Sequence, residues 1–265
     1  MNRRPGHREW IGPLSLVFCV LLVVVPIVAT IIVSFSPDAS NMSLFGGITT
    51  EWYARAWLLL LPKIGPTLTV TSMVLVGAMI VVFPLCHALA RRLVPGGAVI
   101  RQITMLPLAV PGVALGLALA ASDPALRSSG VLLVVGQLLI TVPFLVAGLV
   151  PALADPDLVE AERVAATLGA GPVRRLLTIT LPSIRLSLAA ALLMAAALSI
   201  GEFNLSFFVV SPAYQTAPFA LFSAFLTQRV EVGAAGSMLF GVALLPAAIV
   251  AAMLARSSLS RKETS

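Results

Sequence analysis

Long stretches without charge are the feature that most constrains how this 265-residue chain folds. Five intervals contain no Asp, Glu, Lys or Arg, at 10–37, 64–90, 102–122, 128–154 and 232–255, and a sixth from 186 to 210 contains only Glu202. An apolar run of about 18 residues or more is typical of a helix that crosses a bilayer. Only 11% of the residues are charged, against roughly 25% in soluble domains. The sequence therefore predicts an all-α, polytopic membrane protein.

We expect six transmembrane helices, because a helix pairs all the backbone groups of such a segment internally. Their predicted bounds are 11–36, 64–90, 102–122, 130–154, 186–210 and 232–255, within a single domain over 1–265. The first interval is too long for the apolar core of a signal peptide, which has about 7–15 residues. An even number of helices places both ends of the chain on the same side.

The basic residues are divided unequally between the two faces that six helices create. Thirteen lie in the N-terminal segment, in the loops after the second and fourth helices and in the C-terminal segment, and four lie on the other face: Arg55, Lys63, Arg127 and Arg229. Loops rich in Lys and Arg stay in the cytoplasm, so both termini are predicted to be cytoplasmic. Topology and contact with anionic membrane lipids account for the net charge of +6, and we expect no nucleic acid as a partner.

The loop over 155–183, between the fourth and fifth predicted helices, is longer and more patterned than a simple connection. Asp155 followed by Pro156 is typical of a helix N-terminus. Gly169 provides a left-handed residue that ends such a helix. Between these ends, residues at spacings of three and four predict one apolar face: Leu158, Ala161, Ala165 and Leu168.

A second short helix is predicted over 173–178, after Gly171 and Pro172. We expect Leu181 and Pro182 to end this helix and to lead into the fifth transmembrane helix. The loop would then consist of two short helices parallel to the membrane. A pair of amphipathic surface helices without a partner is the alternative interpretation.

The spacing within this loop resembles that of a known family. Gly169, nine further residues and then Ile179-Thr180-Leu181-Pro182 resemble the glycine and I-x-L-P part of the EAA loop in permease subunits of bacterial ATP-binding-cassette (ABC) importers. Arg163, Val164 and Ala165 stand where that family has Glu-Ala-Ala, with Glu160 and Glu162 as nearby acids. The segments 106–116 and 198–203 resemble the subgroup that imports molybdate, sulfate, ferric iron, phosphonates or polyamines.

The resemblance implies the type I importer fold, in which two permease subunits, identical or homologous, lie side by side in the bacterial cytoplasmic membrane. Each docks its loop on a cytoplasmic ATPase dimer, and an extracytoplasmic substrate-binding protein delivers the solute. ATP and magnesium would be held by the ATPase, and this chain is expected to bind no cofactor or metal, because it has no phosphate-binding loop. The resemblance implies these coupling residues: Glu160, Glu162, Ala165, Leu168, Gly169, Ala170, Arg174, Leu176, Ile179, Leu181 and Pro182.

Glu202 is the one acidic residue deep within a predicted helix. A charge at that depth is costly unless it faces water or a partner, so Glu202 is predicted either to pair or cap within the protein or to contact the solute or gate. Asn204, Ser206 and Pro111 are the other candidates for the translocation path. Their alternative roles are interhelical packing and ordinary helix kinks.

Two other classes of function are weighed against an importer permease. A secondary transporter acting alone would show an inverted repeat or several intramembrane charges, and a membrane-embedded enzyme would show a catalytic group of residues. The sequence shows neither pattern, and no catalytic residue is expected. We therefore predict an importer permease for a small charged solute, an oxyanion, phosphonate, ferric ion or polyamine, with a sugar or peptide as the alternative.

Overall fold

The computed structural model describes residues 8–39, 46–122, 124–209 and 211–263, and within these ranges it consists of helices and turns without a strand. The all-α fold class is thereby confirmed. The chain forms two compact units, one from Met1–Leu60 and Leu221–Val242, the other from Leu61–Ala220 and Ala243–Ser265. Arg3 and Arg4, which the sequence places in the cytoplasm, lie outside the described residues.

Four helical segments of the described chain are long and apolar enough to cross a membrane: Leu14–Phe35, Glu51–Ala90, Val131–Leu153 and Pro172–Gly201. A fifth span arises if Gly97–Ala109 and Gly112–Ala120, which meet at 93°, form one broken span. A polytopic membrane protein is confirmed, but the predicted number of six is not reached. The sixth predicted helix falls within α13 (Val230–Glu263), of which Val230–Pro246 counts as a shorter apolar helix.

The first unit contains α1 (Arg8–Phe35), the start of α2 (Glu51–Gly77), the end of α12 (Ala217–Thr227) and the start of α13. Polar contacts hold the segment that follows α1. The indole of Trp52 donates to the backbone oxygen of Ser36 at 2.7 Å, and the buried Glu231 accepts from the amide of Ala39 at 2.7 Å. Arg229 joins Glu231 at 3.0 Å and Asp38 at 2.7 Å. These contacts fix the entry to α2.

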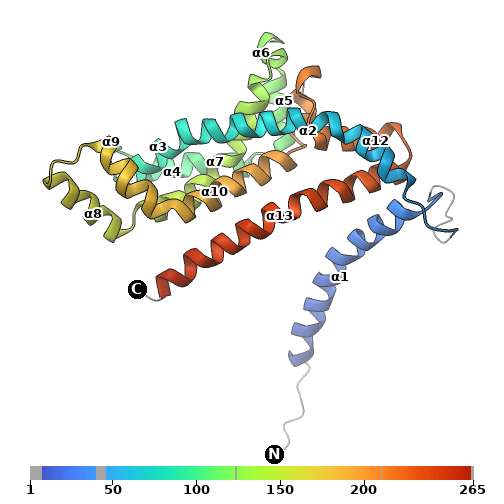
Figure 1. Ribbon diagram of the computed structural model, residues 1–265, viewed down its shortest axis with the longest axis horizontal. Coiled ribbons are helices and arrows are strands. Elements are labelled where there is room, and N and C mark those ends of the chain that lie inside the picture. The colour runs from blue at the N-terminus through green and yellow to red at the C-terminus, as the bar shows by residue number, and fades with distance from the viewer. Residues whose placement is uncertain (1–7, 40–45, 123, 210, 264–265) are drawn as a thin grey trace, which may run out of the picture. The chain divides into compact units, whose positions relative to one another are not determined.

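The second unit is built around α7 (Val131–Leu153) and α10 (Leu181–Gly201), which lie side by side (Figure 1). The helices α3 (Phe83–Ala90) and α4 (Gly97–Ala109) also pack against α7. Their shared core buries Phe83, Leu145, Leu149 and Ile184. The short elements α6 (Pro124–Ser128) and η3 (Pro212–Tyr214) complete this unit beside α5 (Gly112–Ala120) and α11 (Ser206–Val209).

A π-helical turn precedes a proline in two of the long segments. The turns are η1 (Ala78–Val82) before Pro84 and η2 (Leu176–Thr180) before Pro182, and in each the next amide donates five residues back. Proline lacks an amide hydrogen and crowds the carbonyl four residues earlier, so a wider turn relieves both problems. Pro182 therefore does not end the second short helix as predicted. Instead α9 (Pro172–Arg175), η2 and α10 run on as one helix of 30 residues.

Two predicted transmembrane helices are interrupted. The third breaks at Val110, whose extended backbone (φ −94°, ψ 122°) precedes Pro111, because a residue before proline avoids the helical conformation. The fifth ends at Gly201 rather than at 210, with Glu202 extended (φ −73°, ψ 121°). The helices that follow the two breaks, α5 and α11, pack against each other. The breaks therefore meet in one part of the second unit.

Candidate functional site

The loop predicted to couple to an ATPase, residues 155–183 and called the coupling loop below, forms the end of the second unit that carries α8 and α9 (Figure 1). In α8 (Pro156–Thr167) the Asp155 carboxylate accepts the amide hydrogen of Asp157 at 3.0 Å, which caps the helix at the predicted residue. Gly169 has φ +82°, a left-handed conformation that glycine adopts without strain. The amide of Ala170 then donates to the oxygen of Ala165 at 3.0 Å. The loop thus has a helix, a glycine turn and a second helix, each set by local sequence.

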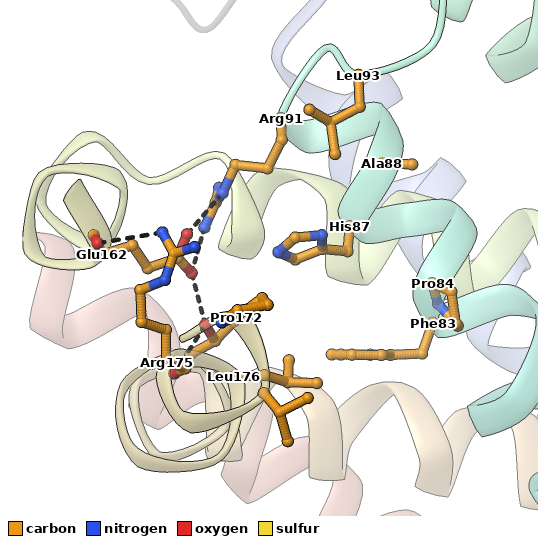
Figure 2. A pocket seen from close by; sticks show the side chains of 12 residues that line it. Phe83, Pro84, His87, Ala88, Arg91, Leu93, Glu162, Pro172, Arg175 and Leu176 are labelled. Carbon is orange, nitrogen blue, oxygen red and sulfur yellow. Dashed lines mark hydrogen bonds and ion pairs between the residues drawn. The ribbon is translucent and has the colours of Figure 1, made fainter. Parts of the chain in front are cut away.

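Glu162 points from α8 into the protein, where two residues bind its carboxylate. Arg91 donates from Nε to Oε2 at 2.9 Å and from Nη2 to Oε1 at 2.7 Å, and the Thr180 hydroxyl donates to Oε1 at 2.5 Å. Figure 2 shows this carboxylate facing Arg91. Burial raises the pKa of Glu162, but the hydrogen bonds from Arg91 and Thr180 outweigh it and hold that pKa below its usual 4.5. The pair is therefore ionised at neutral pH.

Arg91 links the loop to the ends of two transmembrane helices. It is the C-terminal capping residue of α3, and its Nη1 donates to the backbone oxygen of Leu153 at the end of α7. Arg175 adds a long hydrogen bond from Nη1 to the backbone oxygen of Glu162 at 3.4 Å. We call Arg91, Glu162, Arg175 and Thr180 the Arg91 cluster. This cluster therefore connects α8 to the ends of α3 and α7.

The predicted coupling residues divide into an outward and an inward set. Glu160 belongs to the outward set, and its carboxylate pairs with Arg163 at 2.8 Å where both side chains are mostly exposed. The remaining outward residues are Leu168, Gly169, Arg174 and Pro182. The inward, partly buried residues are Glu162, Ala165, Ala170, Leu176, Ile179 and Leu181.

The apolar face predicted for α8 is not buried as one surface. Leu158 is buried at the start of the helix, but Ala161 is exposed and Leu168 is 82% exposed. The glycine turn carries Leu168 away from the bundle. Val164, Val173 and Leu177 are also exposed, so the tip of the loop presents apolar side chains outward. Such side chains are available to a partner.

Glu202 caps the interruption after α10. Its Oε1 accepts the amide hydrogen of Leu205 at 2.7 Å, and its Oε2 accepts the amide and hydroxyl hydrogens of Ser206 at 2.9 and 2.7 Å. Three hydrogen bonds thus satisfy the carboxylate inside the protein, an arrangement that offsets the cost of its depth. Contact of Glu202 with a solute stays a prediction.

A chain of buried polar side chains continues from Ser206. Its hydroxyl accepts from Gln137 Nε2 at 3.3 Å, and Gln137 Oε1 accepts from Ser199 at 2.6 Å. Ser199 and Thr71 are hydrogen-bonded at 3.1 Å. All four side chains are buried, and they come from α11, α7, α10 and α2. These hydrogen bonds therefore fix how the four helices are aligned around Glu202.

The two helix breaks meet where glycines allow close approach. A Cβ on Gly112 would lie 3.3 Å from Cβ of Asn204, and one on Gly116 would lie 3.2 Å from the backbone of Leu205. Asn204 and Pro111 are exposed beside this contact, whereas Ser206 is buried. The four predicted path residues thus belong to one region, the crossing of α5 and α11, although only some of them face outward.

Sequence reasoning does not identify Arg91 and Thr180 as the partners of Glu162, nor Gln137 as the residue that bonds Ser206 beside Glu202. Arg91 directly follows the uncharged interval 64–90, and Thr180 occupies the variable position of I-x-L-P, so neither position indicates a partner for an acid. Gln137 carries a detectable signal, because it is a lone amide within the uncharged interval 128–154. A polar side chain in such a segment usually faces another helix.

The chain is similar to three transport proteins. Over 164 residues it is 30% identical to a provisionally named 2-aminoethylphosphonate transport system permease protein, PhnV, from Salmonella typhimurium, Salmonella choleraesuis and Salmonella paratyphi A. The matched stretch is 60% of this chain, and the chain spans 58% of the length of each relative. No family model matches the sequence. Over the matched stretch, the chain is therefore similar to proteins named as transport system permeases.

Proposed function

We propose that this chain is the permease subunit of an ATP-driven importer for a small charged solute. The similarity to the PhnV proteins is the observation that carries the proposal. Their name supports a phosphonate as the solute, within the class of small charged compounds that the sequence predicts. The membrane orientation follows from the distribution of basic residues, with both termini and the coupling loop in the cytoplasm.

A separate ATPase dimer is the proposed motor, and the coupling loop is its docking element. The exposed tip supports this role, because Leu168 and Val164 offer apolar contacts to a partner. The Arg91 cluster also supports the docking role, because it connects α8 to α3 and α7. Closure of the ATPase dimer would thus move the loop and, through the cluster, the transmembrane helices. A second permease subunit and an external binding protein complete the proposed importer.

The test compares two glycines with the same left-handed geometry. Gly169 has φ +82° and Gly96 has φ +73°, and a Cβ on either would meet no atom within 4 Å. Both lie on the predicted cytoplasmic face, but Gly96 lies outside the coupling loop. We expect Gly169→Asp to leave the subunit folded and to abolish uptake of 2-aminoethylphosphonate while the copurified ATPase still hydrolyses ATP. Gly96→Asp, at the N-cap of α4, should transport normally.

Crosslinking provides a second measurement, made on this chain after it is purified with its ATPase in mild detergent. Leu168→Cys should crosslink to the ATPase, because this side chain is 82% exposed at the loop tip. Leu176→Cys is a more stringent test, since Leu176 is partly buried and a crosslink there requires closer approach of the ATPase. Normal uptake by Gly169→Asp, or uptake by vesicles that contain this polypeptide alone, would contradict the proposal.

A further inference from the structure

A cavity of about 700 Å³ opens beside the Arg91 cluster. One wall comes from the end of the second transmembrane segment, with Phe83, Pro84 and His87, and the other comes from α9 and η2, with Val173 and Leu176. Figure 2 shows His87 and Phe83 reaching into the space from α3, opposite Arg175 and Leu176. Most of the lining is therefore apolar, with a basic group of residues at one end.

The charges around this cavity do not balance. Arg91 is matched by Glu162 at 2.7 Å. Arg175 has no carboxylate within 4 Å among the described residues, and its Nη1 reaches only the neutral backbone oxygen of Glu162. Its Nε is buried and has no hydrogen-bond partner in the described part of the chain. Arg175 as a whole is only partly buried, but a buried N–H donor without an acceptor is unfavourable, and an anion beside the guanidinium group would supply one.

The exposed apolar residues at the rim of the cavity favour an amphipathic anion as the ligand. Leu93 and Val173 are each 67% exposed there, and Pro84 is exposed beside them. The cavity lies at the predicted cytoplasmic end of the second transmembrane helix, which is the depth of lipid headgroups. A free phosphate ion would contact the arginines but not the apolar rim. A phospholipid would contact the arginines with its phosphate and the apolar rim with its acyl chains.

We propose that this cavity binds the headgroup phosphate of an anionic phospholipid, with Arg175 as its main partner. The excess of one positive charge matches a headgroup that carries one negative charge, such as phosphatidylglycerol. The ammonium group of a zwitterionic headgroup would need a second carboxylate, and Glu162 is already bound to Arg91. This site goes beyond the proposed transport function, because its occupancy can be measured without an ATPase or a solute.

The test counts lipid bound to the full chain. The protein is placed in nanodiscs of phosphatidylcholine alone or with one fifth phosphatidylglycerol, and retained lipid is counted by native mass spectrometry. Wild type should retain one phosphatidylglycerol per chain. Arg175→Gln should bind it about fivefold more weakly, the loss expected for one basic contact. Arg174→Gln is the matched control, since this neighbouring arginine is exposed and does not line the cavity, and it should bind as wild type does.

A second pair of variants keeps the test independent of Arg175. Val173→Glu places a negative charge at the exposed rim and should repel the phosphate, whereas Val173→Gln should not. Equal retention of phosphatidylglycerol by Arg175→Gln and Arg174→Gln, or by the two Val173 variants, would overturn the proposal. The lipid assignment also fails if millimolar inorganic phosphate stabilises the lipid-free chain against heat as much as phosphatidylglycerol does. None of these results depends on whether the loop couples to an ATPase.

Discussion

Glu160 and Glu162 lie two positions apart on α8, yet their carboxylates have different surroundings. Glu160 pairs with Arg163 at the surface, where the two side chains are 60% and 69% exposed. Glu162 binds Arg91 where both are about one tenth exposed, and it also accepts from Thr180. Exposed ion pairs contribute about 0–1 kcal/mol, whereas breaking a buried pair costs several times more. The position of the loop therefore depends on Glu162.

We expect Glu162→Gln to lower the free energy of unfolding by about 2 kcal/mol at pH 7, the scale of a charge-assisted hydrogen bond. Because the pKa of Glu162 is lowered on folding, its contribution is complete above its usual 4.5 and is lost as the pH falls through the folded value. Thermal midpoints of wild type and variant, measured between pH 7 and pH 3, should converge at the acidic end. Glu160→Gln is the control and should differ little from wild type throughout. A constant gap between wild type and Glu162→Gln would contradict the assignment.

Some residues could be predicted from sequence because their geometry is local. The Asp155 cap and the Gly169 turn depend on neighbours within five residues, and the structure has both. The partner of Glu162 could not be predicted in this way, since Arg91 lies 71 residues earlier in the chain. The Gln137–Ser199 contact spans 62 residues. Pairing at such distances depends on how the helices pack, which a single sequence does not specify.

At the scale of elements, the interrupted helices depend on close packing at glycine. Gly116 of α5 faces the backbone of Leu205, and a Cβ there would lie 3.2 Å from both Cα and O of that residue. A backbone neighbour cannot change rotamer, so the two elements must separate to admit a methyl group. The contact between α5 and α11, and with it the position of Glu202, therefore requires glycine.

Gly116→Ala is expected to lower the free energy of unfolding by about 1–3 kcal/mol, the range for overpacked sites. Gly201→Ala is the matched control, because a Cβ on Gly201 would meet no atom within 4 Å. It should be neutral or slightly stabilising. Thermal midpoints in the same detergent measure the difference, and equal midpoints for the two variants would show that α5 and α11 are not tightly packed.

The long apolar elements were predictable, whereas their interruptions were only partly so. Uncharged intervals located the main segments, because hydrocarbon excludes charge at any position along a helix. Pro111 and Pro182 have the same sequence signal, yet one accompanies a 93° bend and the other lies in a continuous helix. The difference is the π-helical turn before Pro182, which depends on the packing of η2 against α8 and α10. The early end of α10 likewise depends on capping by Glu202.

At the scale of the whole molecule, the distribution of charge predicts the orientation in the membrane. Within the second unit, α6 and the coupling loop lie at opposite ends of the helices (Figure 1). The coupling loop carries Arg163, Arg174 and Arg175, whereas the α6 region carries Arg127 alone. This asymmetry favours a cytoplasmic coupling loop.

Labelling of single cysteines measures this orientation. In a chain whose two native cysteines, Cys19 and Cys86, are replaced, we expect Ser129→Cys to react with a membrane-impermeant maleimide in intact spheroplasts. Leu168→Cys should react only after the membrane is opened. The side chains of Ser129 and Leu168 are both exposed, so burial does not limit access of the reagent to a cysteine at either position. The reverse pattern would place the coupling loop outside the cell and rule out docking to a cytoplasmic motor.

The break between α4 and α5 has a consequence for hydration. The first turn of α5 has no side-chain cap, and the leading amides of a helix have no partner within it. Hydrocarbon offers such groups nothing to bind, so they must meet water wherever the surrounding protein leaves them uncovered. We therefore expect the bend between α4 and α5 to stay hydrated, since Pro111, Val113 and Ala114 at the start of α5 are exposed.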